Sequence, residues 1–168
     1  AKGKAIVVAV HRTLESLHRA GVEPDMTIAV ECRDVQHQFM NVGIEHLAAV
    51  ALASTVLPNL QDLGAARTIQ FASNAWEGWL LPEHQRNQNF VSSLGTVSHS
   101  AVSLAKLWGC DPIILVGQDL SFPQGRVYHD QGADGDTHIQ RDENSGHFQL
   151  NGFSKWRNHT LGEEADEL

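Results

Sequence analysis

The 168-residue sequence contains few cysteines, few basic residues and no long apolar run. Its two cysteines, Cys32 and Cys110, lie far apart and outside any C-x-x-C spacing, which favours two buried thiols in a reducing, cytoplasmic compartment over a disulfide framework. No stretch is long and apolar enough to span a bilayer, and no signal segment is recognisable. With 12 Lys and Arg against 20 Asp and Glu, the net charge of -8 argues against general binding to nucleic acids or anionic membranes.

Common catalytic and metal-binding motifs are also missing. The sequence has no G-x-x-x-x-G-K-[ST], no G-x-S-x-G and no H-E-x-x-H, so no motif supports a P-loop, an α/β-hydrolase or a zinc enzyme. The segment D-Q-G-A-D-G-D resembles a calcium loop, but Gly132 occupies a ligand position and Arg141 stands where the closing Glu belongs. We therefore predict a solvated acidic loop and no metal site, with a magnesium site in this loop as the alternative.

The apolar residues that are present fall into short runs separated by helical or polar segments. The predicted strands are Ala5–Val10, Met26–Val30, Leu47–Ala53, Thr68–Phe71 and Ile113–Val116. The run Leu47–Ala53 also suits a buried helical turn, but we favour a strand. A helix over Thr13–Ala20, stopped by Gly21, makes the opening a strand–helix–strand unit. The pattern predicts a single α/β, Rossmann-like, three-layer domain with a mostly parallel sheet over 1–160.

The last part of the chain gives weaker signals. Phe148, Leu150, Phe153 and Trp156 alternate with polar residues, which indicates an edge strand or a hairpin packed on the sheet. Residues 161–168 are an acidic tail.

The stretch Gly95–Tyr128 is where we expect the chemistry. It predicts a helix ended by Gly109, the buried strand Ile113–Val116 and then a polar loop. In parallel α/β sheets, ligands bind outside the carboxyl ends of the strands. Gly95, Thr96 and Ser98 begin the helix, where backbone N–H groups favour an anion, although one hydroxyl is needed to cap the helix. We expect this helix start and Gly117–Tyr128 to face one crevice.

Several side chains of the loop could carry the reaction. Asp119 can bind a ribose hydroxyl or a metal, or hold its own loop through backbone N–H groups. Gln118 can hydrogen-bond a base or a sugar. His129 and His138 flank the loop, and either can act as a general base near neutral pH; we favour His129.

Two blocks of the sequence resemble a known family. The run A-x-x-L-A-K-L-W-G-C-D-P-I-I-L-V-G-Q-D-L resembles the motility accessory factors, bacterial flagellin glycosyltransferases that share a domain with 6-hydroxymethylpterin diphosphokinase-like proteins. The opening K-G-K-A-I-V-V-A-V and L-H-R-A-G-V-E-P-D-M-T-I-A-V are similar to the same domain. More distantly, the first run is similar to bacterial sialyltransferases, which implies a sialyltransferase-like fold.

The resemblance implies a function. It implies transfer of a nonulosonic, sialic-acid-like sugar from a CMP-activated donor to Ser or Thr hydroxyls of flagellin, without a metal cofactor. The first alternative is an ATP- and Mg²⁺-dependent enzyme similar to 6-hydroxymethylpterin diphosphokinase. The second is a non-catalytic nucleotide-binding fragment.

The resemblance also implies roles for single residues. Tyr128 stands where a loop tyrosine would contact the donor phosphate, with Phe122 in place of a second tyrosine, and Asp119 and His129 are the expected catalytic groups. Glu31 stands at a strand end where the family suggests an Asp that binds substrate. The family domain carries a G-x-G-P-S-L loop on a strand ahead of Ala5–Val10, which this sequence does not contain. We therefore expect a fragment of a longer protein with little or no activity alone.

Overall fold

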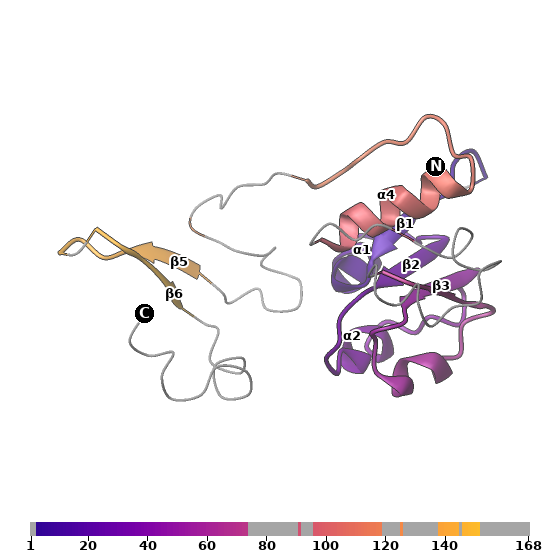
Figure 1. The fold of residues 1–168 in the computed structure, drawn as a ribbon, viewed down its shortest axis with the longest axis horizontal. Helices are drawn as coiled ribbons and strands as arrows, with labels where there is room; N and C mark the ends of the chain where they lie inside the picture. The colour runs from indigo at the N-terminus through magenta and orange to yellow at the C-terminus, as the bar shows by residue number, and fades with distance from the viewer. Residues whose placement is uncertain are drawn as a thin grey trace. The chain divides into compact units, whose positions relative to one another are not determined.

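The computed structural model describes residues 3–73, 91, 96–118, 125, 138–144 and 146–151 (Figure 1). The chain divides into two units, Ala1–Leu115 and Val116–Leu168. Among the described residues, none of the helices has the length and apolar character needed to cross a bilayer.

The first unit is built on a four-stranded sheet in which every neighbouring pair is parallel. The strands are β1 (Val8–Val10), β2 (Met26–Ala29), β3 (Ala49–Ala53) and β4 (Thr68–Phe71). They lie in the order β1-β2-β3-β4, so each strand pairs with the next one along the chain. This arrangement confirms the predicted α/β class, and the run Leu47–Ala53 is a strand from Ala49 onward.

Short helices connect the strands. They are the 3-10 helix η1 (His11–Thr13), α1 (Leu14–Arg19), α2 (Gln36–Met40), the 3-10 helix η2 (Pro58–Asp62) and α4 (Val97–Leu107). The predicted helix over Thr13–Ala20 is confirmed to within one residue at each end by α1, and the 3-10 turn η1 precedes it. The predicted stops are confirmed: Gly21 and Gly109 have φ of 68° and 76°, which suits glycine.

The core lies between the sheet and its helices. Every residue of β2 and β3 is buried, as expected for parallel strands covered on both faces. Figure 1 shows α4 on one side of the sheet and α1 and α2 on the other. Phe39 of α2 and Leu104 of α4 both belong to the buried cluster around the sheet. The three layers expected from the sequence are thus present in this unit.

The second unit contains an antiparallel hairpin of β5 (His138–Arg141) and β6 (Phe148–Asn151). Asp142 supports its turn, since its carboxylate accepts a hydrogen bond from the Asn144 N–H at 2.8 Å and its carbonyl accepts one from the Gly146 N–H at 2.8 Å. Of the two alternatives predicted from Phe148 onward, an edge strand or a hairpin, the structure shows a hairpin, with β5 as a strand that was not predicted. Its packing on the sheet stays a prediction.

One predicted strand is wrong. The run Ile113–Val116 is neither helix nor strand, and Ile114, Leu115 and Val116 are 79%, 60% and 86% exposed. A strand needs a neighbour that accepts its main-chain hydrogen bonds. Among the described strands, β1 ends the sheet on one side and pairs only with β2, so this run has no described strand beside it.

Candidate functional site

The carboxyl ends of the four parallel strands define one edge of the sheet, which we call the carboxyl edge. The loops that leave it after β1, β2 and β3 begin at His11, Val30 and Ser54. The helix α4 also begins at this edge. Its last turn, at Trp108, lines a groove together with Ala5 and Ile6, which precede β1, so α4 runs antiparallel to the strands. The carboxyl edge therefore gathers predicted site residues from two distant segments, Glu31 on one and Thr96 and Ser98 on the other.

A hydrogen-bond network joins the loops that follow β2 and β3. The Asp34 carboxylate accepts from the Gln36 N–H at 3.1 Å and from the Asn59 side-chain amide at 3.2 Å. The same Asn59 amide donates to the Gln36 side chain at 3.2 Å. Nearby, the Thr55 hydroxyl donates to the Val30 carbonyl at 3.4 Å. These bonds fix the two loops against each other and give the carboxyl edge a defined polar rim.

Glu31 lies in the loop that follows β2. It is the second residue after β2 and is half-buried, between Val30 and the exposed Cys32. A carboxylate at the end of a central parallel strand is well placed to accept hydrogen bonds from two neighbouring sugar hydroxyls. The substrate-binding role expected for Glu31 stays a prediction.

Thr96 is the N-cap of α4. Its hydroxyl oxygen accepts from the His99 N–H at 3.3 Å, and the His99 ring Nδ1 lies 3.0 Å from the same oxygen. Capping, the simpler of the two roles considered for this residue, is thus confirmed. Ser98 is half-buried in the first turn, where the N–H groups of Val97 and Ser98 have no partner within the helix. An anion at this end would bind those N–H groups and the Ser98 hydroxyl rather than the Thr96 side chain.

His11 is a residue that the sequence analysis missed. It follows β1, is 1% exposed and stacks on Phe39 with ring centroids 5.8 Å apart. Its Nδ1 lies 3.3 Å from the Ile28 carbonyl oxygen. A carbonyl only accepts, so Nδ1 carries the proton and Nε2, which has no hydrogen-bond partner, is the bare nitrogen of a neutral ring.

The environment of His11 keeps it neutral. Burial lowers the pKa of His11 from 6.5 to about 4, the hydrogen bond to Ile28 opposes this shift, and the charges of Arg12 and His37 add to it. The one signal in the sequence for His11 is its position directly after an apolar strand. With 10 histidines in the chain, this signal is too weak to single out His11. His11 supports the carboxyl edge from inside and is not accessible to a ligand.

The other predicted site residues are only partly described. Gly117, with φ of 71°, and Gln118 are exposed and belong to the second unit. The predicted crevice between them and the start of α4 therefore stays a prediction. His138 begins β5, opposite Asn151. Gly95, Asp119, Tyr128 and His129 lie outside the described residues.

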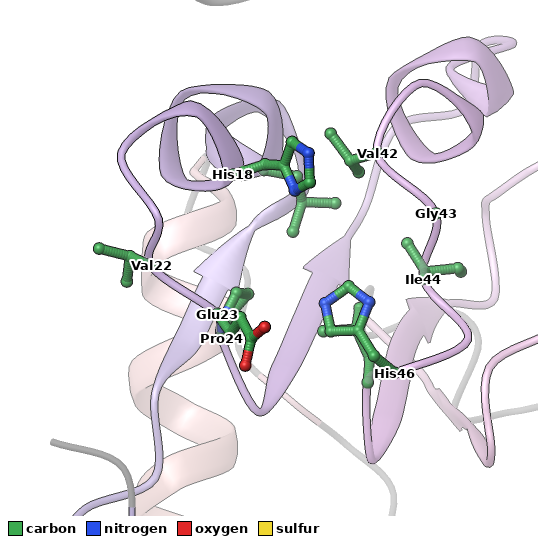
Figure 2. A pocket seen from close by; sticks show the side chains of 10 residues that line it. His18, Val22, Glu23, Pro24, Val42, Gly43, Ile44 and His46 are labelled. Atoms are coloured by element: carbon green, nitrogen blue, oxygen red, sulfur yellow. The ribbon is translucent and has the colours of Figure 1, made fainter.

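The amino edge of the sheet carries a small pocket of another kind. It lies between the end of α1, the turn before β2 and the loop before β3, and Figure 2 shows His18, Glu23 and His46 from these three segments around it. Its volume of about 20 Å³ holds roughly one water molecule. No predicted site residue lines it. Within the described part of the chain, no three His, Cys, Asp or Glu side chains are grouped so that they could hold a metal ion.

Comparison with known proteins gives one match. A family model described as 6-hydroxymethylpterin diphosphokinase MptE-like matches residues 1–125. The chain belongs to the MptE-like family. The match spans the parallel sheet, the carboxyl edge and α4, and it confirms the domain type that the two sequence blocks indicated. No curated protein and no solved structure matches the chain.

Proposed function

We propose that this MptE-like chain is the central part of a glycosyltransferase. It would transfer a nonulosonic sugar from a CMP donor to a Ser or Thr hydroxyl, with flagellin as the acceptor and the cytoplasm as the compartment. The observation that carries the proposal is the carboxyl edge itself: an all-parallel sheet whose polar rim brings a carboxylate, Glu31, and a helix N-terminus, at Thr96 and Ser98, to one side. A carboxylate can bind the hydroxyl groups of a ribose, and a helix N-terminus can bind a phosphate.

In the proposed reaction, the acceptor hydroxyl oxygen forms a bond to the anomeric carbon of the donor sugar. The bond from that carbon to the phosphate oxygen of CMP breaks, and CMP leaves with the electron pair. The hydroxyl proton passes to a general base, for which His129 and Asp119 are the proposed groups. The transition state is oxocarbenium-like, so stabilising the departing phosphate lowers the barrier. The first-turn N–H groups of α4 would supply this stabilisation.

The test uses the full-length protein, a CMP-nonulosonate and an acceptor peptide. Glu31→Gln keeps the size of the side chain and removes its charge, and we expect it to raise KM for the donor by about tenfold, from loss of charged hydrogen bonds. Glu45→Gln, at an exposed position before β3, is the matched control. If Glu31→Gln transfers sugar like the control, and Asp119→Ala combined with Tyr128→Phe is also fully active, the site assignment is wrong.

A second candidate has the activity that the family description names, that of a diphosphokinase. That enzyme would transfer diphosphate from ATP to the hydroxyl of a pterin alcohol, with Mg²⁺ held by the acidic residues of 130–143. The same full-length protein separates the two candidates. Product formation from ATP and 6-hydroxymethylpterin that a chelator abolishes supports the kinase, whereas chelator-resistant sugar transfer supports the glycosyltransferase.

A further inference from the structure

The first turn of α4 holds a histidine ring in a fixed position at the carboxyl edge. His99 is exposed, and its Nδ1 lies 3.0 Å from the hydroxyl oxygen of Thr96, the N-cap of the helix. The same oxygen accepts a hydrogen bond from the His99 main-chain N–H at 3.3 Å. The main chain and the ring of His99 are thus both bound to one hydroxyl, which holds the ring against the start of the helix.

These contacts indicate which ring nitrogen of His99 carries the proton. A hydroxyl has one proton to donate and lone pairs that accept. Since the Thr96 oxygen already accepts from a main-chain N–H, its own proton is free to form the hydrogen bond to Nδ1. Nδ1 is then the bare nitrogen of a neutral ring, and Nε2 carries the N–H. On an exposed side chain, this N–H can donate to a group outside the helix.

A second side chain of this turn calls for a partner. Ser100 is fully buried, and its hydroxyl oxygen has no hydrogen-bond partner in the part of the chain that the structure describes. A buried hydroxyl without a partner is destabilising, so such groups are rare in folded proteins. Side chains of an α-helix lean toward its N-terminus. The Ser100 hydroxyl therefore points toward the same end of α4 as the free N–H groups of the first turn.

The groups at the start of α4 that still lack a partner can all donate. They are the N–H groups of Val97 and Ser98, which have no partner within the helix, and the Ser100 hydroxyl. Nε2 of His99 adds a further donor. A set of donors at a helix N-terminus suits an oxyanion such as phosphate. We propose that His99 is a catalytic residue that donates a hydrogen bond from Nε2 to a phosphate oxygen of the donor nucleotide, and that Thr96 positions its ring.

This role rests on the proposed function and adds a residue to it. In the proposed reaction, the bond from the anomeric carbon to the phosphate oxygen breaks and CMP leaves with the electron pair. Negative charge on the phosphate therefore grows toward the transition state, and a hydrogen bond from His99 strengthens with it and lowers the barrier. The proton stays on Nε2 throughout. His99 is thus distinct from the general base, which receives the proton of the acceptor hydroxyl.

The first experiment measures binding of CMP and of cytidine, which has no phosphate, to the full-length protein by calorimetry. His99→Ala should raise the Kd for CMP by at least about tenfold, from loss of a hydrogen bond to a charged group, and should leave the Kd for cytidine unchanged. His99→Gln can place its amide N–H where Nε2 lies and should keep most of the CMP affinity. His99→Asn is too short for this and should behave like His99→Ala. His46→Ala, which removes an exposed histidine before β3, is the matched control and should bind both compounds like the wild type.

Nitrogen NMR of the histidine rings in the wild-type protein gives a second readout that needs no variant. We expect the Nε2–H tautomer for His99, and a shift of its Nε2 signal when CMP or inorganic phosphate is added but not when cytidine is added. An Nδ1–H tautomer, or no shift with either phosphate, would overturn the proposal. So would a His99→Ala variant that binds CMP like the wild type, or one that loses affinity for cytidine as much as for CMP.

Sugar transfer separates this proposal from the proposed function. If the full-length protein transfers the sugar, His99→Ala should lower kcat by about 100-fold, as loss of one donor to a developing oxyanion does. An unchanged kcat would refute the catalytic role of His99 and leave the proposed function standing. If CMP binding depends on His99 but no sugar is transferred, the proposed function is wrong, and the contact between His99 and a nucleotide phosphate is supported.

Discussion

His11 makes the stability of the first unit depend on pH. The ring is neutral when folded because burial lowers its pKa from 6.5 to about 4. Above pH 6.5 the group is neutral in both the folded and the unfolded state and has no effect on their balance. Between pH 6.5 and 4 the unfolded chain binds a proton that the folded chain excludes, so stability falls as the pH falls, and below pH 4 the loss levels off. Since one pH unit corresponds to about 1.4 kcal/mol, the total loss is about 3 kcal/mol.

The assay is urea unfolding at several pH values between 7.5 and 3.5. His11→Gln keeps an N–H that can donate to the Ile28 carbonyl but does not titrate, so it should lose about 3 kcal/mol less than the wild type between pH 6.5 and 4. Any lower stability of the His11→Gln variant at neutral pH does not affect the test, because the test compares how the free energy of unfolding changes with pH. His46→Gln, which removes an exposed histidine before β3, is the control and should follow the wild type. If wild type and His11→Gln lose stability in parallel, the buried neutral state of His11 is refuted.

Two further predictions concern local contacts. The Asp25 carboxylate accepts a hydrogen bond from the Val7 N–H at 2.7 Å, so Asp25→Ala should lower the free energy of unfolding by about 1.5 to 3 kcal/mol; an effect no larger than that of Glu45→Ala, measured by urea unfolding, would contradict this. Thr96→Ala removes the cap of α4 and should cost about 1 kcal/mol, whereas Thr96→Ser should cost less than half of that; equal losses for the two variants would show that the hydroxyl does not cap the helix.

The sequence predicted the sheet well because its signal is local. The strands β2 and β3 are continuous apolar or β-branched runs, and β4 is such a run with one glutamine. Each of the three lies where the pattern placed it, to within a residue or two. The glycines that end α1 and α4 were also predictable, since the backbone after each helix has a positive φ. These features depend on the residues within one turn or one strand and need no knowledge of the rest of the fold.

The candidate site was predictable only in part, because its contacts join distant segments. The Asn59 amide meets the Asp34 carboxylate across 25 positions of sequence, and no periodicity in either segment indicates that pairing. His11 shares its residue type with nine other histidines, and what distinguishes it is burial against Phe39 and Ile28. In contrast, the start of α4 was predicted as a binding site because the N–H groups at a helix N-terminus favour an anion, and Glu31 was predicted from the resemblance to the family.

The comparison of β3 with Ile113–Val116 shows what a local pattern leaves undetermined. Both are short runs of apolar residues bounded by turns, and both were predicted to be core strands. Every residue of β3 is buried, and it pairs with β2 on one side and β4 on the other. The second run is exposed and has no described strand beside it. Composition therefore indicates that a run is suited to a strand. Whether the run is buried depends on whether another strand lies beside it.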